Sequence, residues 1–109
     1  MQVAVIHTAF EDAPRTVALV EAGDRKGTEA LEYAYRWTNN VEGSWSIKQE
    51  VFEDGQANGD FNQDVTVMHE LHKDDDGKTW GLRSTSVRDQ MLMGTEKYVV
   101  ASIGFDKLK

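Results

Sequence analysis

The sequence predicts an α+β domain in which one main helix packs on a curved, mostly antiparallel sheet of about five to six strands. Three observations carry this prediction. Only one segment, residues 28–40, has an apolar stripe with helical spacing. Several other segments have the alternation or the β-branched composition of strands. The segments after the helix are also joined by turns of hairpin length. A lone amphipathic helix has no second helix to pack on, so it must lie across the sheet.

Composition limits the class of protein. With 109 residues, the chain is expected to form one domain, residues 1–109, that buries a core without disulfides. The absence of cysteine excludes a thiolate metal site and a cysteine nucleophile, and it agrees with a reducing cytoplasm. No apolar run is long enough to span a membrane, and the first residues lack the pattern of a secretory signal. We therefore expect a cytoplasmic protein without membrane association.

The charge balance bears on the partner. Twelve basic and nineteen acidic residues give a formal net charge of −7. This argues against direct binding to nucleic acid, because cationic side chains supply most of the affinity for a phosphate backbone. Solubility is the simplest reason for the charge. The alternative is an acidic face that competes with nucleic acid for a basic partner protein. The chain has one acidic block for such a face, namely Asp74, Asp75 and Asp76.

The first half of the chain predicts two strands and the helix. Residues 2–8 have apolar side chains on both faces, which predicts a central strand. Residues 10–15 form a loop, and residues 16–21 a second strand paired with the first. Thr28 is expected to cap the helix, since a threonine side chain can accept a bond from a first-turn amide. Asn39 and Asn40 are expected to end it in a left-handed conformation.

The second half predicts further strands. Residues 44–52 and 64–72 are expected to be strands, with a loop over residues 53–63 between them. A second hairpin turns at residues 73–78 and returns through residues 79–83. The last hairpin pairs residues 90–93 with residues 97–103 around the turn Gly94-Thr95-Glu96. Gly104 and Phe105 then fold an aromatic ring back onto the sheet.

No catalytic, metal or cofactor site is predicted. His69 and His72 lie three residues apart on an expected strand, so their rings point to opposite faces. Ser84, Thr85 and Ser86 lack the surroundings of a nucleophile and are expected to bond backbone groups. Asp89 is expected to form a local ion pair or turn cap with Arg83 or Arg88. Such a pair at the surface stabilises a protein by at most about 1 kcal/mol.

The tryptophans are the best candidates for a protein interface. All three lie near the ends of expected elements and next to polar residues. Tryptophans in a small domain usually belong to the core, but one that stays exposed beside an arginine is a favoured interface anchor. Together with the acidic block and two arginines, they form the predicted interaction set: Trp37, Trp45, Asp74, Asp75, Asp76, Trp80, Arg83 and Arg88.

The C-terminal third also resembles a known group of sequences. The residues that carry the resemblance are Arg83, Ser84, Ser86, Val87, Asp89, Tyr98, Val100, Gly104 and Phe105. This pattern is similar to that of YodL-like domains of conjugative elements and of short bacteriophage proteins. Residues 30–46 also look like a helix and a Gly-Ser-Trp-Ser turn of the phage proteins. Arg88 stands where the resemblance predicts glycine. The resemblance implies a mobile-element gene product that acts inside a bacterial cell, and it implies no catalytic role.

Three hypotheses about function follow. The first is a non-enzymatic phage or mobile-element protein that binds and modulates a host or defence protein. The second is a nucleic-acid-associated accessory domain that uses Arg83, Arg88, Lys97 and Trp80 as a local basic and aromatic patch. The third is a small metal- or nucleotide-dependent enzyme built on His7, His69 and the acidic block. The sequence leaves the oligomeric state open between a monomer and a homodimer.

Overall fold

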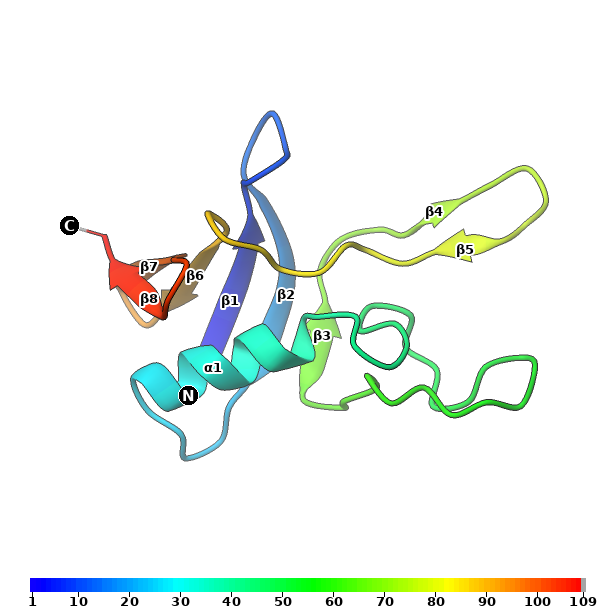
Figure 1. The fold of residues 1–109 in the computed structure, drawn as a ribbon, viewed down its shortest axis with the longest axis horizontal. Helices are drawn as coiled ribbons and strands as arrows, with labels where there is room; N and C mark the ends of the chain where they lie inside the picture. Colours follow the sequence, from blue (N-terminus) through cyan, green and yellow to red (C-terminus); the bar gives the residue numbers. More distant parts are fainter. Residues whose placement is uncertain (109) are drawn as a thin grey trace.

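The computed structural model describes residues 1–108 and confirms the α+β class. Helix α1 (Thr28–Trp37) crosses one face of a six-stranded antiparallel sheet, and a separate two-stranded sheet projects to one side (Figure 1). The large sheet has the order β3-β2-β1-β6-β7-β8. Its strands are β1 (Gln2–His7), β2 (Arg15–Glu21), β3 (Val65–Val67), β6 (Gln90–Met93), β7 (Glu96–Val100) and β8 (Phe105–Lys107). The small sheet consists of β4 (His72–Lys73) and β5 (Thr79–Trp80).

The first strand is central, as predicted. β1 pairs with β2 on one side and with β6 on the other, so that Val5 lies opposite both Ala18 and Met91. The pairing of β1 with β2 shifts register between Val5 and Ile6. Such a bulge opposes two residues of one strand to one of the other. It accompanies burial of two successive β2 residues, Val17 and Ala18.

The core lies between α1 and the sheet. Ala30, Leu31 and Ala34 form the buried stripe of the helix. They share a core cluster with buried side chains of the sheet, among them Val3, Val5, Val20, Met91 and Val100. Trp45 belongs to the same cluster and is fully buried, and its indole N–H donates to the Arg83 carbonyl at 2.9 Å. The prediction that Trp45 contributes to an interaction surface is therefore wrong, because the side chain is part of the core.

Both ends of α1 differ from the prediction. The N-cap is Gly27 with φ 57° and no side-chain cap, and Thr28 is the first helical residue. At the other end Thr38 is the C-cap with φ −113°, and its hydroxyl donates to the Ala34 carbonyl at 2.7 Å. The asparagines after it do not adopt the left-handed conformation. Among the described non-glycine residues, only Arg88 does so, with φ 81°.

Residues 44–52 do not form the expected strand, because side chains occupy the backbone groups that a ladder would use. The Asp60 carboxylate accepts bonds from three successive amides, those of residues 41–43, at 2.7–2.9 Å. The Asn58 side chain accepts a bond from the Ser44 amide and donates to the Ser44 carbonyl. It also donates to the carbonyls of Ile47 and Gln49. Both Asn58 and Asp60 are buried. Residues 44–52 therefore form an irregular loop that Asn58 holds directly, while Asp60 holds the turn just before it.

The last strands follow the prediction, with β6 at the predicted bounds and β7 shorter than predicted. β6 and β7 form the expected hairpin, in which Gln90 lies opposite Val99. The expected strand over residues 97–103 stops at Val100, where a turn containing Gly104 (φ 73°) leads into β8. There the Phe105 ring packs edge-on against Tyr35, with centroids 6.3 Å apart. The expected strand over residues 64–72 is confined to β3, since the chain then leaves the sheet to form the small β4–β5 sheet.

Candidate functional site

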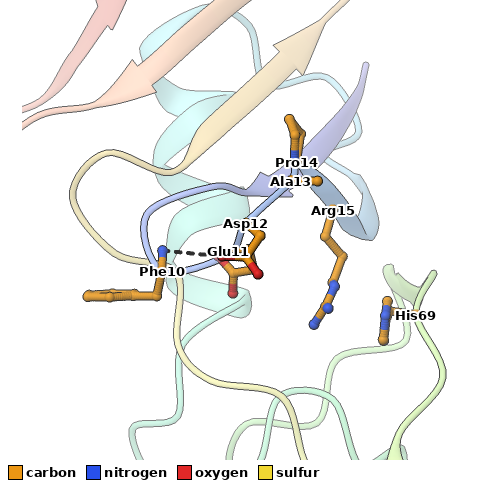
Figure 2. Close-up of a pocket in the computed structure, with 7 residues that line it drawn as sticks. All are labelled: Phe10, Glu11, Asp12, Ala13, Pro14, Arg15 and His69. Atoms are coloured by element: carbon orange, nitrogen blue, oxygen red, sulfur yellow. Dashed lines mark hydrogen bonds between the residues drawn. The ribbon is translucent and has the colours of Figure 1, made fainter.

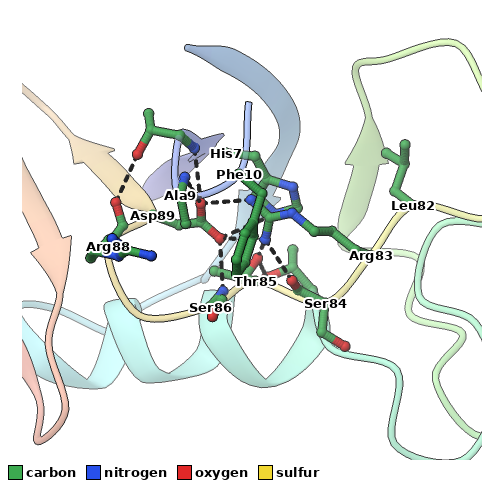
Figure 3. A network of polar contacts seen from close by, with 12 residues as sticks. His7, Ala9, Phe10, Leu82, Arg83, Ser84, Thr85, Ser86, Arg88 and Asp89 are labelled. Atoms are coloured by element: carbon green, nitrogen blue, oxygen red, sulfur yellow. Dashed lines mark hydrogen bonds and ion pairs between the residues drawn. The ribbon is translucent and has the colours of Figure 1, made fainter. Parts of the chain in front are cut away.

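A polar cluster lies where the segment before β6 crosses the end of β1 (Figure 3). The buried His7 ring contacts the Thr85 hydroxyl through Nε2 at 3.0 Å, and that hydroxyl donates to Thr38 at 2.8 Å. All three side chains are at most 2% exposed. The His7 ring also meets Trp45 edge-on, at a centroid distance of 6.4 Å. These contacts join β1, the crossing segment and the end of α1 into one buried unit.

The second half of the cluster is built around the Asp89 carboxylate, which is fully buried. It accepts bonds from the backbone amides of Thr8, Ala9 and Ser86 at 2.7–2.9 Å. The Arg83 guanidinium donates to both of its oxygens at 2.7 and 2.8 Å. Arg83 also binds Glu11 through two nitrogens, at 2.8 and 3.1 Å. The predicted pair of Asp89 with Arg83 is thus present, but the carboxylate lies in the interior and not at the surface.

The protonation states follow from these surroundings. Burial by itself raises the pKa of Asp89, but the Arg83 guanidinium and the three amides outweigh it and lower the pKa to about 2. The bond from Asp89 in turn raises the pKa of Arg83. Burial lowers the pKa of His7 to about 4, against the opposing effect of Asp89. At neutral pH the cluster therefore holds a neutral imidazole beside an ionised carboxylate–guanidinium pair.

The contacts of this cluster hold β1, the crossing segment and the end of α1 together, which is a structural role. A catalytic imidazole and hydroxyl must reach a substrate, whereas His7 and Thr85 are covered by protein. The Thr85 hydroxyl is also occupied by both His7 and Thr38. Sequence reasoning missed the contact of His7 with Thr85, which joins residues 78 positions apart. A histidine on the inward face of a predicted central strand was the one available signal.

An open hollow lies next to the cluster, under the loop between β1 and β2 (Figure 2). It is lined by residues 10–15 and His69 and has a volume of 590 Å³. The Phe10 side chain points away from the other lining residues. No group of three histidine or acidic side chains that could hold a metal ion occurs within residues 1–108. The residues that line the hollow therefore do not form a ligand set for a metal ion.

The β4–β5 sheet forms an arm, residues 71–81, that projects from the body of the molecule (Figure 1). Trp80 on this arm is 51% exposed. Its indole N–H donates to Asp74 at 3.0 Å, and the Lys78 ammonium lies 4.4 Å from the ring centroid. Asp74 also accepts bonds from the amides of Asp76 and Lys78 at 3.0 and 2.9 Å. The bond from Trp80 is the main reason that the pKa of Asp74 is lowered.

The arm faces a second projection. The loop over residues 47–54 lies beside it, and the two enclose an open groove of 690 Å³. The groove is lined by Ile47, Gln49, Phe52, Glu53, Asp54, Asp76, Gly77, Lys78 and Thr79. Its walls thus combine an aromatic ring and an aliphatic side chain with three carboxylates. Asp75 extends the same acidic character at the exposed tip of the arm.

The structure brings together half of the predicted interaction set. Asp74, Asp75, Asp76 and Trp80 all lie on the arm. Trp37 lies elsewhere, half-buried at the end of α1 with the Arg36 guanidinium 4.1 Å from its ring centroid. Arg83 is held in the polar cluster, while Arg88 is exposed in the turn before β6.

The two alternative constellations are not assembled. Arg83 is not available to the basic and aromatic patch, because its guanidinium is paired with the carboxylates of Glu11 and Asp89. Its other members are divided between the arm, the turn before β6 and β7. The third hypothesis needs His7 near His69, but His7 is buried at the end of β1 and His69 lines the surface hollow.

Comparison with protein-family models, with curated proteins and with solved structures found no match to the chain. No helix in the described part of the chain has the length and apolar character needed to cross a membrane.

Proposed function

We propose that this chain is a small non-enzymatic binding protein, and that its arm docks on a basic surface of a host or defence protein in a bacterial cell. The observation that carries the proposal is the position of Trp80. This large side chain is 51% exposed and held in place on a projecting arm. Tryptophan is among the side chains that most often dominate the binding energy of protein interfaces.

The arm contributes little to the stability of the fold. Each of its strands has two residues, and no buried hydrophobic side chain comes from it. Forming an extension of this kind orders a stretch of the chain and leaves an aromatic ring exposed, and no buried apolar contacts are gained in return. The bonds of Asp74 to the indole and to the turn amides hold the tryptophan in one orientation. Such preorganisation lowers the entropy that binding must overcome.

The charge around the arm favours a basic partner. Residues 48–57 and 70–81 together contain seven acidic and three basic residues, a balance of −4 in 22 residues, against −7 for the whole chain. Asp74 is occupied within the arm, whereas Asp75 and Asp76 have exposed carboxylates at its tip. Complementary charge raises the rate of association and suppresses unsuitable partners. The mobile-element context rests on the resemblance around residues 83–105, and with it the bacterial cytoplasm as the place of action.

Replacing Trp80 with alanine is expected to weaken partner binding by about 2 kcal/mol or more, roughly 30-fold, because it removes the anchor. The fold should be unaffected, since the side chain packs on nothing in the core. The measurement is affinity capture from bacterial lysate with tagged wild-type protein, identification of the captured protein, and titration of that protein by biolayer interferometry. Increasing salt should weaken the same complex.

Phe10→Ala is the matched control, because Phe10 is an exposed aromatic residue, at 68%, that lies away from the arm. It should retain the captured partner. Loss of binding in both variants would count against the arm as the contact. Capture of no specific protein, or equal affinity of the Trp80→Ala variant, would contradict the proposal itself.

A further inference from the structure

The sheet face turned away from α1 carries an unexpected set of apolar side chains. Ala4, Ile6, Leu19, Leu92 and Val99 are half-buried, and each alternates along its strand with residues on the helix side. None of them belongs to the core cluster or to the partly buried hydrophobic residues packed against it. An antiparallel sheet with one solvated face normally has polar residues on that face. This set instead spans β2, β1, β6 and β7.

The strand registers arrange this face in two rows that cross the sheet. The first row reads Thr66, Leu19, Ala4, Leu92 and Lys97 from β3 to β7. The second row reads Thr16, Ile6, Gln90, Val99 and Asp106 from β2 to β8. The first row has three apolar residues between its polar ends, whereas the second has Ile6 and Val99 on either side of Gln90, again between polar ends. A charged residue ends each row on the β7–β8 side.

We propose that this face binds the same face of a second copy of the chain, with the two-fold axis running across the strands between the two rows. Such an axis lays the first row of each copy on the second row of the other. The small side chain of Ala4 then meets the large side chain of Ile6 in the partner, and the reverse contact occurs by symmetry. Two sheets stacked in this way bury their facing side chains in a layer about 10 Å thick.

The charges on the face favour a second copy over an unrelated apolar partner. Lys97 and Asp106 lie on adjacent strands of the open face, and neither takes part in an ion pair within residues 1–108. The neighbouring Lys107 is different, because it points to the helix side and pairs with Glu96 at 3.2 Å. In the proposed dimer, Lys97 of each copy approaches Asp106 of the other. The face therefore carries both a positive and a negative residue, and each can pair with the opposite charge on a second copy.

The size of the face sets the expected strength. Five strands at about 4.8 Å spacing, with two rows about 7 Å apart, give a contact of a few hundred Å² per copy. Specific interfaces bury about 800 Å² per partner, so this contact lies at the weak end. We therefore expect a dimer that forms with increasing concentration and dissociates on dilution. This face is separate from the arm, so the dimer and the proposed partner binding can fail independently.

The test is sedimentation equilibrium of the full chain at 5–500 µM (about a hundredfold range, chosen for a weak dimer). The wild type should show a monomer–dimer equilibrium. Lys97→Asp should raise the dissociation constant about tenfold, since it places two carboxylates together at both symmetry-related contacts. The double variant Lys97→Asp with Asp106→Lys should restore the wild-type value. Leu92→Thr should raise the dissociation constant at least tenfold while its unfolding midpoint stays near that of the wild type.

Lys107→Asp is the matched control, because it makes the same charge change on the neighbouring strand but on the helix side of the sheet. It should leave the dissociation constant unchanged. A wild type that stays monomeric at the highest concentration overturns the proposal. A dimer that Lys97→Asp and Leu92→Thr leave intact overturns it as well, because that dimer must use another surface. A dimer weakened by Lys97→Asp but not restored by the double variant overturns the proposed axis.

Discussion

Replacing Asp89 with alanine is expected to reduce the free energy of unfolding by about 3–5 kcal/mol, the range for removing one partner of a buried ion pair. The variant leaves the Arg83 guanidinium without its buried partner and removes the acceptor of three backbone amides, those of Thr8, Ala9 and Ser86. Each buried donor left without an acceptor adds a desolvation penalty. Urea unfolding monitored by tryptophan fluorescence measures the change. Small domains have only about 5–15 kcal/mol in total, so the loss should be evident as a large fall in the urea midpoint.

Glu11→Gln is the control for this prediction. Glu11 binds the same arginine, but its side chain is 14% exposed and its other contacts are few. Its loss is expected to destabilise the fold by about 1 kcal/mol, as for a pair near the surface. Equal losses of unfolding free energy in the two variants would show that the burial of Asp89 adds nothing to stability. This would contradict the structural role given to the cluster.

Local sequence patterns were sufficient to predict the main elements of this fold. The helix depends on a stripe of residues three and four apart, such as Ala30 and Ala34, and both are buried where the pattern placed them. The last hairpin depends on two β-rich segments joined by a glycine-containing turn, and its register confirms them. In each case the residues that determine the element lie within a few positions of one another.

The irregular loop over residues 44–52 could not be predicted in the same way. Its composition is that of a strand, and Trp45 is indeed buried. However, its backbone groups bond to Asn58, a residue that lies 9–14 positions away within a predicted surface loop. A single sequence gives no sign that this particular asparagine turns inward. The tertiary contact therefore overrode the local preference for a strand.

The same reasoning explains the mixed outcome for the candidate site. The arm was found because its turn, its acidic block and Trp80 are close in the sequence. The polar cluster around Asp89 depends on the backbone amides of residues 80 and 81 positions away. Every residue type except proline has such an amide, so the sequence does not reveal these donors. Arg88 is a further case. Its φ of 81° lies in the region that glycine adopts most easily, and no local feature of the sequence indicates this conformation for an arginine.

Lowering the pH from 7 to 5 is expected to reduce the free energy of unfolding by about 2 kcal/mol through His7 alone. Burial lowers the pKa of this histidine from 6.5 to about 4 in the folded protein. Between these two values the unfolded chain binds a proton that the folded chain excludes, so stability falls as the pH falls. Below about pH 4 both states are protonated and the loss from His7 is complete. The contribution of Asp89, whose pKa is lowered to about 2, is lost only below about pH 4.

Urea unfolding at several values between pH 7 and pH 5 measures this slope while Asp89 remains ionised. His7→Gln keeps a side chain that can bond to Thr85 but does not titrate, so its stability should be nearly constant across the same range. His72→Gln is the matched control, because His72 is exposed on the arm and its loss should leave the wild-type slope. If His7→Gln retained the full slope, the proton would bind elsewhere and the neutral, buried state assigned to His7 would be wrong. If His7→Gln abolishes the slope, the buried contacts of His7 that join β1, α1 and the crossing segment are also what makes the stability of the fold sensitive to acid.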